Sequence, residues 1–232
     1  MSIGARAELV RCEGAARTYG SGETATVALQ PTDCVVGPGD RIALVGPSGS
    51  GKSTLLHLMA GLDAPTLGSV SWPAIGALDS LRPGPIAVIF QGPSLLPPLT
   101  VEENVALPLI LGGTSDREAH DVARQSLQLL DLRELGDKLP EEISGGQAQR
   151  VAVARALAGA PRLILADEPT GQLDRASGAA VVDVLLAATA HAGAALVVST
   201  HDLTVADRLP DRWAMDNGRM STTGLKERAW SR

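Results

Sequence analysis

The stretch RIALVGPSGSGKST, residues 41–54, decides the fold of this chain. Its first five residues form an apolar run typical of a buried strand, and a helix is expected over Lys52–Gly61. Between them lies the pattern G-x-x-x-x-G-K-[ST], whose glycines let several backbone N–H groups converge on one phosphate. In such a loop the lysine contacts the β- and γ-phosphates, and the following hydroxyl is a ligand for Mg²⁺. The sequence therefore predicts a nucleotide site made of Gly46, Pro47, Ser48, Gly49, Ser50, Gly51, Lys52, Ser53 and Thr54.

Three more apolar runs follow along the chain, separated by segments with helical spacing. The runs are Ile86–Phe90, Arg162–Ala166 and Ala195–Ser199, and the helical segments are Asp116–Leu132, Gly145–Ala158 and Ser177–Ala192. Because the runs are continuous rather than alternating, both faces of these strands should be covered, as in a parallel sheet. The sequence predicts an α/β fold, a P-loop NTPase core with a mostly parallel sheet. The Pro- and Gly-broken residues 92–116, with the helices that follow, look like an inserted helical lobe.

The length of 232 residues fits one domain, 1–232, with core segments at about 1–91 and 160–232 and the helical lobe at about 92–159. The net charge is −6, from 20 basic and 26 acidic residues, so nucleic acid is not an expected partner. Cys12 and Cys34 fit no metal or redox spacing and read as residues of a reduced protein. No apolar run approaches the roughly 18 residues of a membrane span. Residues 1–20 lack the apolar core of a secretory signal.

Polar residues follow several of the predicted strands. Gln91 follows one strand, Asp167 and Glu168 another, and His201 a third. The carboxyl ends of parallel strands form the crevice where ligands bind. There Asp167 would hold Mg²⁺ through water, and Glu168 would polarise the attacking water. Taken singly, the two acids could equally be surface residues, whereas a lone histidine is more often structural and a glutamine more often lies at the surface. Their shared edge favours function for all of them.

A second candidate anion site lies at Ser144, Gly145, Gly146 and Gln147, at the start of a predicted helix. Ser followed three residues later by Gln is a capping box, so the motif could simply begin a helix. Two glycines beside a capped helix N-terminus also attract an anion. A chain with one phosphate loop has no evident use for a second such site.

Together these motifs resemble the ATP-binding subunit of an ABC transporter over about residues 19–218. GPSGSGKST resembles the Walker A loop, LILADEPT the Walker B strand with its catalytic glutamate, and SGGQAQR the signature. Gln91 matches the Q-loop, Asp174 lies in a segment like the D-loop, His201 matches the switch histidine, and Tyr19 resembles the aromatic residue that stacks on adenine.

The resemblance implies catalytic roles for Glu168, His201, Lys52 and Gln91, and Mg²⁺ ligation by Ser53, Gln91 and Asp167. It also implies an N-terminal antiparallel β-subdomain. Two ATPase subunits would pair head to tail, with each ATP between one Walker A loop and the other subunit's signature. The partner would be an integral membrane permease, with this subunit cytoplasmic and peripheral on the inner face of the cell membrane. Residues 91–100 would be the docking surface, or would equally be a loop packed on its own lobe.

The segments FQGPSLLPPLTVEENVALPLI and ADEPTGQLD look most like the branch that serves lipoprotein release, macrolide export and cell division. The chain is shorter than the family pattern between Gly68 and Gln91. An alternative is an ATPase module that passes a mechanical signal to an envelope enzyme without transport. A DNA-repair or translation ATPase is disfavoured, because the chain has neither a long coiled-coil insert nor a second cassette.

Overall fold

A computed structural model describes residues 7–221. The ends of the predicted 1–232 domain, including the first residues of the segment inspected for a secretory signal, lie outside the described part. The α-helices are α1 (Lys52–Met59), α2 (Val101–Leu111), α3 (Asp116–Leu129), α4 (Gly145–Ala158), α5 (Arg175–Ala192) and α6 (Leu203–Ala206). The strands are β1 (Val10–Tyr19), β2 (Thr26–Val36), β3 (Arg41–Val45), β4 (Leu67–Ser71), β5 (Ile86–Ile89), β6 (Leu163–Asp167), β7 (Ala195–Thr200), β8 (Asp211–Asp216) and β9 (Arg219–Ser221). Short 3-10 turns are η1 (Gly22–Thr24), η2 (Leu78–Ser80), η3 (Arg133–Leu135) and η4 (Pro140–Glu142).

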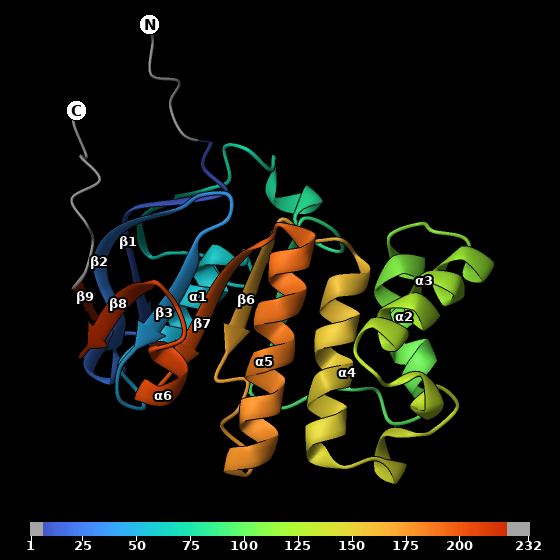
Figure 1. Ribbon diagram of the computed structural model, residues 1–232. Helices are drawn as coiled ribbons and strands as arrows, with labels where there is room; N and C mark the ends of the chain where they lie inside the picture. The colour runs from blue at the N-terminus through green and yellow to red at the C-terminus, as the bar shows by residue number, and fades with distance from the viewer. Residues whose placement is uncertain (1–6, 222–232) are drawn as a thin grey trace, which may run out of the picture.

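The main sheet has the strand order β5-β6-β7-β3-β8-β9. All neighbours pair in parallel except β8 and β9, which are antiparallel. The four predicted strands occupy the centre and one edge of this sheet. Figure 1 shows three of them, β6, β7 and β3, side by side. The predicted α/β fold with a mostly parallel sheet is therefore confirmed.

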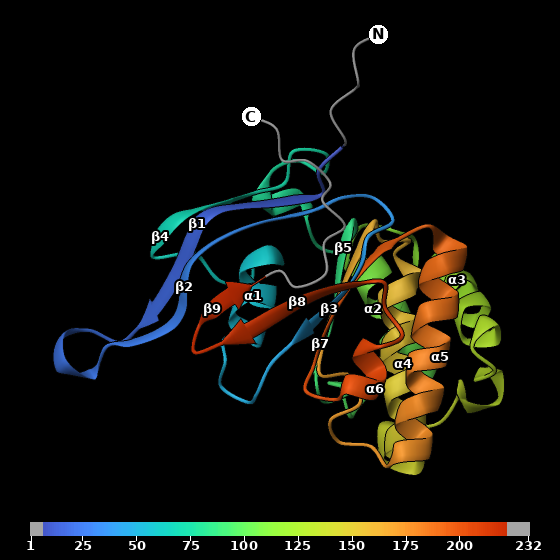
Figure 2. The same cartoon turned by 60° about the vertical axis from the view of Figure 1, so that its left-hand side comes forward.

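Both faces of the main sheet are covered, as the continuous apolar runs predicted. In β6, Leu163 and Leu165 pack into the core beside α1, whereas Ile164 and Ala166 pack into the core beside α4 and α5. Figure 2 shows α1 and the small sheet on one side of the main sheet and the longer helices on the other. Burial on both faces orders these strands, so the residues that follow them are held in fixed places.

The predicted N-terminal antiparallel subdomain is a three-stranded sheet with the order β2-β1-β4. Its strands β1 and β2 pair as Arg17↔Leu29 and Thr18↔Val27, which leaves Ala28 as the extra residue of a bulge. Bulges are common beside active sites because they redirect the strand locally. Cys12 and Cys34 are cross-strand neighbours in this sheet, and both are free and buried.

The helices α2, α3 and α4 pack together beside the main sheet (Figure 1). Helix α2 lies inside the stretch 92–116 that the sequence analysis treated only as Pro- and Gly-broken, so that interpretation was incomplete. Thr100 and Glu103 form a full capping box at its start, which outweighs the single Pro108 in its second half. The pattern Thr-x-x-Glu was the signal that could have found it.

Other predicted boundaries shift by a few residues. Phe90 lies beyond the end of β5, and Asp167 is the last residue of β6 rather than a residue after it. Helix α3 ends at Leu129 because the chain turns through Asp131, which has a φ of 57°. Helix α5 begins two residues before the predicted Ser177, since Asp174 caps it.

Candidate active site

The phosphate loop joins β3 to α1 and wraps around the ammonium group of Lys52. Lys52 Nζ donates to the carbonyl oxygens of Gly46 at 2.8 Å and Pro47 at 3.0 Å. The N-cap of α1 is Gly51, which has a φ of 99° and no side chain to cap the helix. The first N–H groups of an α-helix lack intrahelical partners, so this end of α1 is open to an anion.

Two other segments of the chain are in close contact with the phosphate loop. A Cβ at Gly51 would lie 2.4 Å from the carbonyl oxygen of the bulge residue Ala28, and one at Gly46 would lie 2.2 Å from that of Met215. In addition, the Gly218 N–H donates to the Ser50 carbonyl at 3.0 Å. The turn between β8 and β9 and the bulge in β2 therefore hold the loop in shape.

The buried end of β6 meets the end of β7 through a serine that the sequence analysis did not single out. Ser199 Oγ donates to Asp167 Oδ1 at 2.5 Å and accepts from the Glu168 N–H at 2.9 Å. Asp167 is buried, with 8% of its surface exposed. Ser199 thus fixes one carboxylate and the backbone of the next residue. Its position at the end of a strand beside the Walker B strand was the signal available.

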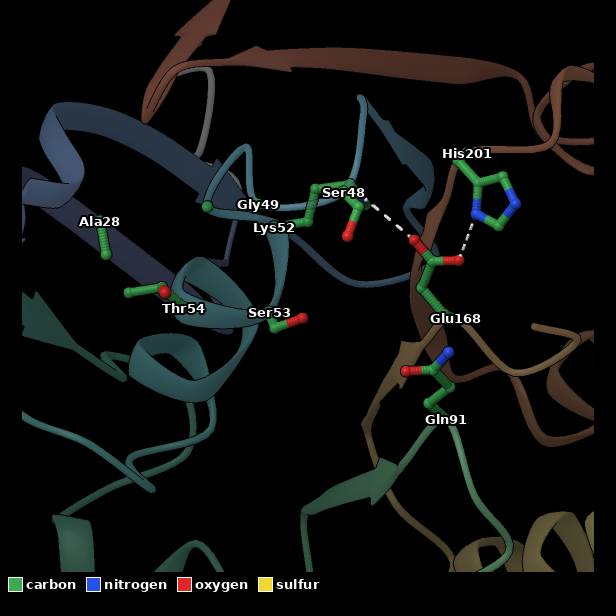
Figure 3. A pocket seen from close by; sticks show the side chains of 10 residues that line it. Ala28, Ser48, Gly49, Lys52, Ser53, Thr54, Gln91, Glu168 and His201 are labelled. Carbon is green, nitrogen blue, oxygen red and sulfur yellow. Dashed lines mark hydrogen bonds and ion pairs between the residues drawn. The ribbon is translucent and has the colours of Figure 1, made fainter. Parts of the chain in front are cut away.

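Glu168 contacts two other predicted site residues at once (Figure 3). Its Oε1 lies 3.1 Å from Lys52 Nζ, and its Oε2 lies 2.5 Å from His201 Nδ1. Its φ of 45° is left-handed, a strained backbone that is frequent at functional sites. The carboxylate therefore lies between a buried cation on α1 and an imidazole after β7.

Gln91 lies on the same wall of the cavity as Glu168 (Figure 3). Helix α4 holds the backbone around it: Gln149 donates to the Phe90 carbonyl at 3.2 Å. Arg155 donates to the carbonyls of Ser94 at 2.9 Å and Pro93 at 3.1 Å. Burial lowers the pKa of the Arg155 guanidinium. The sequence analysis did not assign a role to Gln149 or Arg155. The available signal was that each is a polar side chain on a largely apolar helix.

The cavity bounded by these groups has a volume of about 360 Å³. Its walls combine the phosphate loop, the bulge and the strand ends: Ala28, Ser48, Gly49, Gly51, Lys52, Ser53, Thr54, Gln91, Glu168 and His201. Nine of the predicted site residues therefore line this cavity. Gly46, Pro47 and Ser50 form the backbone behind the wall, and Asp167 lies buried next to it.

The signature residues lie elsewhere in the same subunit. Ser144 accepts from the Gln147 N–H at 3.2 Å, and Gln147 Oε1 accepts from the Ser144 N–H at 2.8 Å, which completes the expected capping box. Figure 1 shows the N-terminal ends of α4 and α5 side by side at the lower end of the molecule. None of residues 144–147 lines the cavity. The role of Ser144–Gln147 as a second anion site stays a prediction.

Asp174 caps α5 beside the signature. Its carboxylate accepts from the N–H groups of Ala176 and Ser177 and from the Ser177 hydroxyl. The hydroxyl bond is the largest of the effects that lower the Asp174 pKa. A Cβ at Gly146 would lie 3.2 Å from Ser177 Cβ, so the two helix starts are in contact.

Tyr19 does not line the cavity, although it ends β1 next to the strand segment that does. Tyr19 is 40% exposed, and its hydroxyl donates to Asp63 at 2.9 Å. The interpretation of Tyr19 as an adenine-stacking residue stays a prediction.

The residues present fit a nucleotide with Mg²⁺. Ser50 Oγ is buried without a partner inside the loop, and Lys52 is a buried cation with 4% exposure. Across residues 7–221, no three His, Cys, Asp or Glu side chains are arranged as a metal site. Mg²⁺ commonly needs only one or two carboxylates when phosphate oxygens complete its coordination. The Ser53 hydroxyl and the Asp167 carboxylate suit that role.

A family model described as "ABC transporter" matches residues 29–171. This chain belongs to the ABC transporter family. Two curated relatives, the lipoprotein-releasing system ATP-binding proteins LolD of Legionella pneumophila strains Lens and Paris, are each 42% identical over 200 residues. The matches cover 83% of this chain and 88% of each relative. The family assignment confirms the resemblance, and this ABC cassette is an ATP-binding ATPase subunit of a membrane transporter.

Solved structures agree with the assignment. The dimeric post-hydrolysis structure of the ATP-binding cassette MJ0796, bound to ADP and Pi, has a TM-score of 0.80 and 36% identity. The match covers 92% of this chain and 98% of the MJ0796 chain. CbiO1 from Clostridium perfringens, part of the transporter complex cbiONQ, has a TM-score of 0.82 over 96% of this chain and 90% of its own. Its identity of 24% supports the fold alone. In the described residues of this ABC cassette, no helix has the length and apolarity to cross a bilayer.

Proposed function

We propose that this ABC ATPase powers a transporter that releases lipidated proteins from a membrane, as a homodimer bound to an integral permease. The substrate class rests on the 42% identity to the lipoprotein-releasing LolD proteins. The pairing is supported by the dimeric form of the MJ0796 cassette and by the signature residues, which do not line the cavity of their own subunit. The subunit would be peripheral on the inner face of the cell membrane. The signalling alternative has no observation in its favour.

The proposal of ATP hydrolysis at this site is supported by the position of Glu168 between Lys52 and His201. Glu168 acts as the general base that orients and deprotonates water, since its carboxylate faces the cavity at hydrogen-bond reach of both partners. Lys52 binds the β- and γ-phosphates once they displace Glu168 from its ammonium group. His201 holds the Glu168 carboxylate in place and donates a hydrogen bond to the transferred phosphoryl group.

The remaining site residues bind and position. Bound Mg²⁺ would neutralise charge on the phosphate oxygens, with Ser53, Gln91 and Asp167 as the residues that hold it directly or through water. Tyr19 stacks on adenine, and Asp174 supports the start of α5 at the subunit interface. The signature residues Ser144–Gln147 of one subunit close over the nucleotide of the other. The helical lobe, about residues 92–159, would carry these signature residues as a subdomain.

The test is an affinity capture of the Glu168→Gln variant with Mg-ATP from detergent-solubilised membranes of the native host. We expect a permease with few membrane spans and a large outer domain. The matched control is the same capture with the Lys52→Ala variant in the absence of ATP. It identifies proteins that bind regardless of the nucleotide state. A permease with many spans together with a substrate-binding protein would overturn the export function. Soluble partners alone would overturn the transport function.

A further inference from the structure

One carboxylate ties Tyr19 to the loop that follows α1. Asp63 Oδ2 accepts from the Tyr19 hydroxyl at 2.9 Å and from Arg17 Nε at 2.9 Å. Asp63 Oδ1 accepts from the Ala64 N–H at 2.8 Å and lies 2.8 Å from Arg17 Nη2. Both oxygens are therefore occupied, and the paired guanidinium holds the carboxylate plane in one orientation.

Arg17 also covers the ring of Tyr19. Its guanidinium carbon lies 4.7 Å from the ring centroid, within the range of a cation–π contact. One face of the ring is thus taken by a cation that Asp63 anchors. Tyr19 is 40% exposed, so part of its side chain is accessible to a stacking partner. Hydroxyl and ring are fixed together, so little side-chain freedom is left to lose when a base binds.

The cluster has a fixed position relative to the phosphate loop. Arg17 and Thr18 pair across the bulge at Ala28, which lines the cavity. Asp63 lies just beyond the C-terminal end of α1, whose N-terminal end carries Lys52. One short helix therefore sets the spacing between the Tyr19 ring and the group that binds phosphates.

We propose that Asp63 is a positioning residue that sets the Tyr19 ring, with Arg17 behind it, for the purine base of ATP. This inference rests on the proposed adenine-stacking role of Tyr19 and names the group that enforces it. Partial burial acts to raise the pKa of Asp63, but the hydrogen bonds from Tyr19 and Ala64 and the charge of Arg17 outweigh it and lower that pKa. Asp63 is then ionised at neutral pH and keeps Arg17 in place.

The test separates base binding from phosphate binding. Calorimetric titration with ATP and with inorganic tripolyphosphate would be compared for the parent, Asp63→Ala, Tyr19→Phe and Tyr19→Ala. Stacking of one base is worth about 1–3 kcal/mol by alanine substitution, or about 5- to 150-fold in affinity. We expect Tyr19→Ala to weaken ATP within that range, Asp63→Ala to weaken it about three- to tenfold, and Tyr19→Phe to weaken it less. Tripolyphosphate binding should be unchanged in all three.

The control is Asp79→Ala, which removes an exposed carboxylate from η2. Asp63→Ala combined with Tyr19→Ala should bind ATP no more weakly than Tyr19→Ala alone, since the carboxylate acts through the ring. If Tyr19→Ala leaves the ratio of the affinities for ATP and tripolyphosphate unchanged, the proposed stacking of Tyr19 on adenine is wrong. If Tyr19→Ala lowers the ratio while Asp63→Ala matches Asp79→Ala, the positioning role of Asp63 is wrong. If Asp63→Ala weakens the binding of ATP and of tripolyphosphate equally, Asp63 has a structural role instead. Asp63→Asn keeps an acceptor oxygen for Tyr19, and an equal loss of both affinities in this milder variant would verify that structural role.

Discussion

Lys52 and Glu168 form an ion pair within the cavity, with Nζ 3.1 Å from Oε1. The same ammonium group is expected to bind the phosphates of ATP, so phosphate and carboxylate compete for it. ATP binding would therefore free Glu168 from Lys52 and leave it with His201, 2.5 Å away on its other side. The base becomes available only when its substrate is present.

Glu168→Gln should keep or tighten ATP binding and lower turnover by about 10²- to 10⁴-fold, because it removes a general base and a competitor for Lys52. ATPase assays and ATP titration would measure the two effects, and light scattering should detect an ATP-bound dimer. Glu134→Gln, at an exposed site in η3, is the control. Turnover at the parent rate would show that Glu168 is not the base.

Ser144→Arg should leave ATP binding by the monomer intact and remove ATP-driven dimerisation, because the side chain would fill the anion site at the start of α4. The dimer would be followed in the Glu168→Gln background by size-exclusion chromatography with light scattering. Ser115→Arg is a matched control, since Ser115 also caps a helix, α3. Normal dimerisation of the Ser144 variant would mean that the signature does not face a second phosphate.

Arg155→Leu should raise the Mg²⁺ concentration needed for half-maximal ATPase activity, because the backbone after Gln91 loses its contacts to α4. Gln91→Ala should do the same. If Arg155 acts through Gln91, the double variant should show less than the sum of the two effects in free energy. Fully additive effects would indicate that Arg155 stabilises the lobe without positioning Gln91.

Ser199→Ala should lower the free energy of unfolding by about 1–2 kcal/mol, since the buried Asp167 carboxylate loses a hydrogen bond. It should also lower turnover, because the backbone of Glu168 loses the same hydroxyl. Urea unfolding and ATPase assays would measure the two effects. Unchanged turnover in a destabilised variant would limit Ser199 to a structural role.

Asp174→Ala should destabilise the protein near neutral pH and have little effect in acid. The folded-state pKa of Asp174 is lowered, so its contribution is present above the unfolded-state pKa of aspartate and is lost as pH falls through the folded-state value. Thermal unfolding midpoints of parent and variant should therefore converge below the ordinary aspartate range. A gap that stays constant well below that range would show that the charged cap is not the cause.

The core of the site could be predicted from the sequence alone because it follows from simple rules. A buried parallel strand must end at the sheet's carboxyl edge, so Gln91, Glu168 and His201 could be assigned to one place from their positions after apolar runs. The phosphate loop was equally clear, because its spacing and its strand–helix context occur together.

What the sequence could not predict depends on contacts between distant segments. The Lys52–Glu168 ion pair, the serine between β6 and β7, and the two side chains of α4 that hold residues 90–94 all require the packed tertiary structure. The signal for α2 was present in Thr100 and Glu103, but the prolines and glycines around it favoured an irregular segment.

The turn between β8 and β9 supports the phosphate loop through Gly218 and Ser50, although these residues lie far apart in the sequence. During synthesis the loop and α1 leave the ribosome long before that turn does. A nascent chain would therefore lack this support for the phosphate loop until residue 218 has emerged.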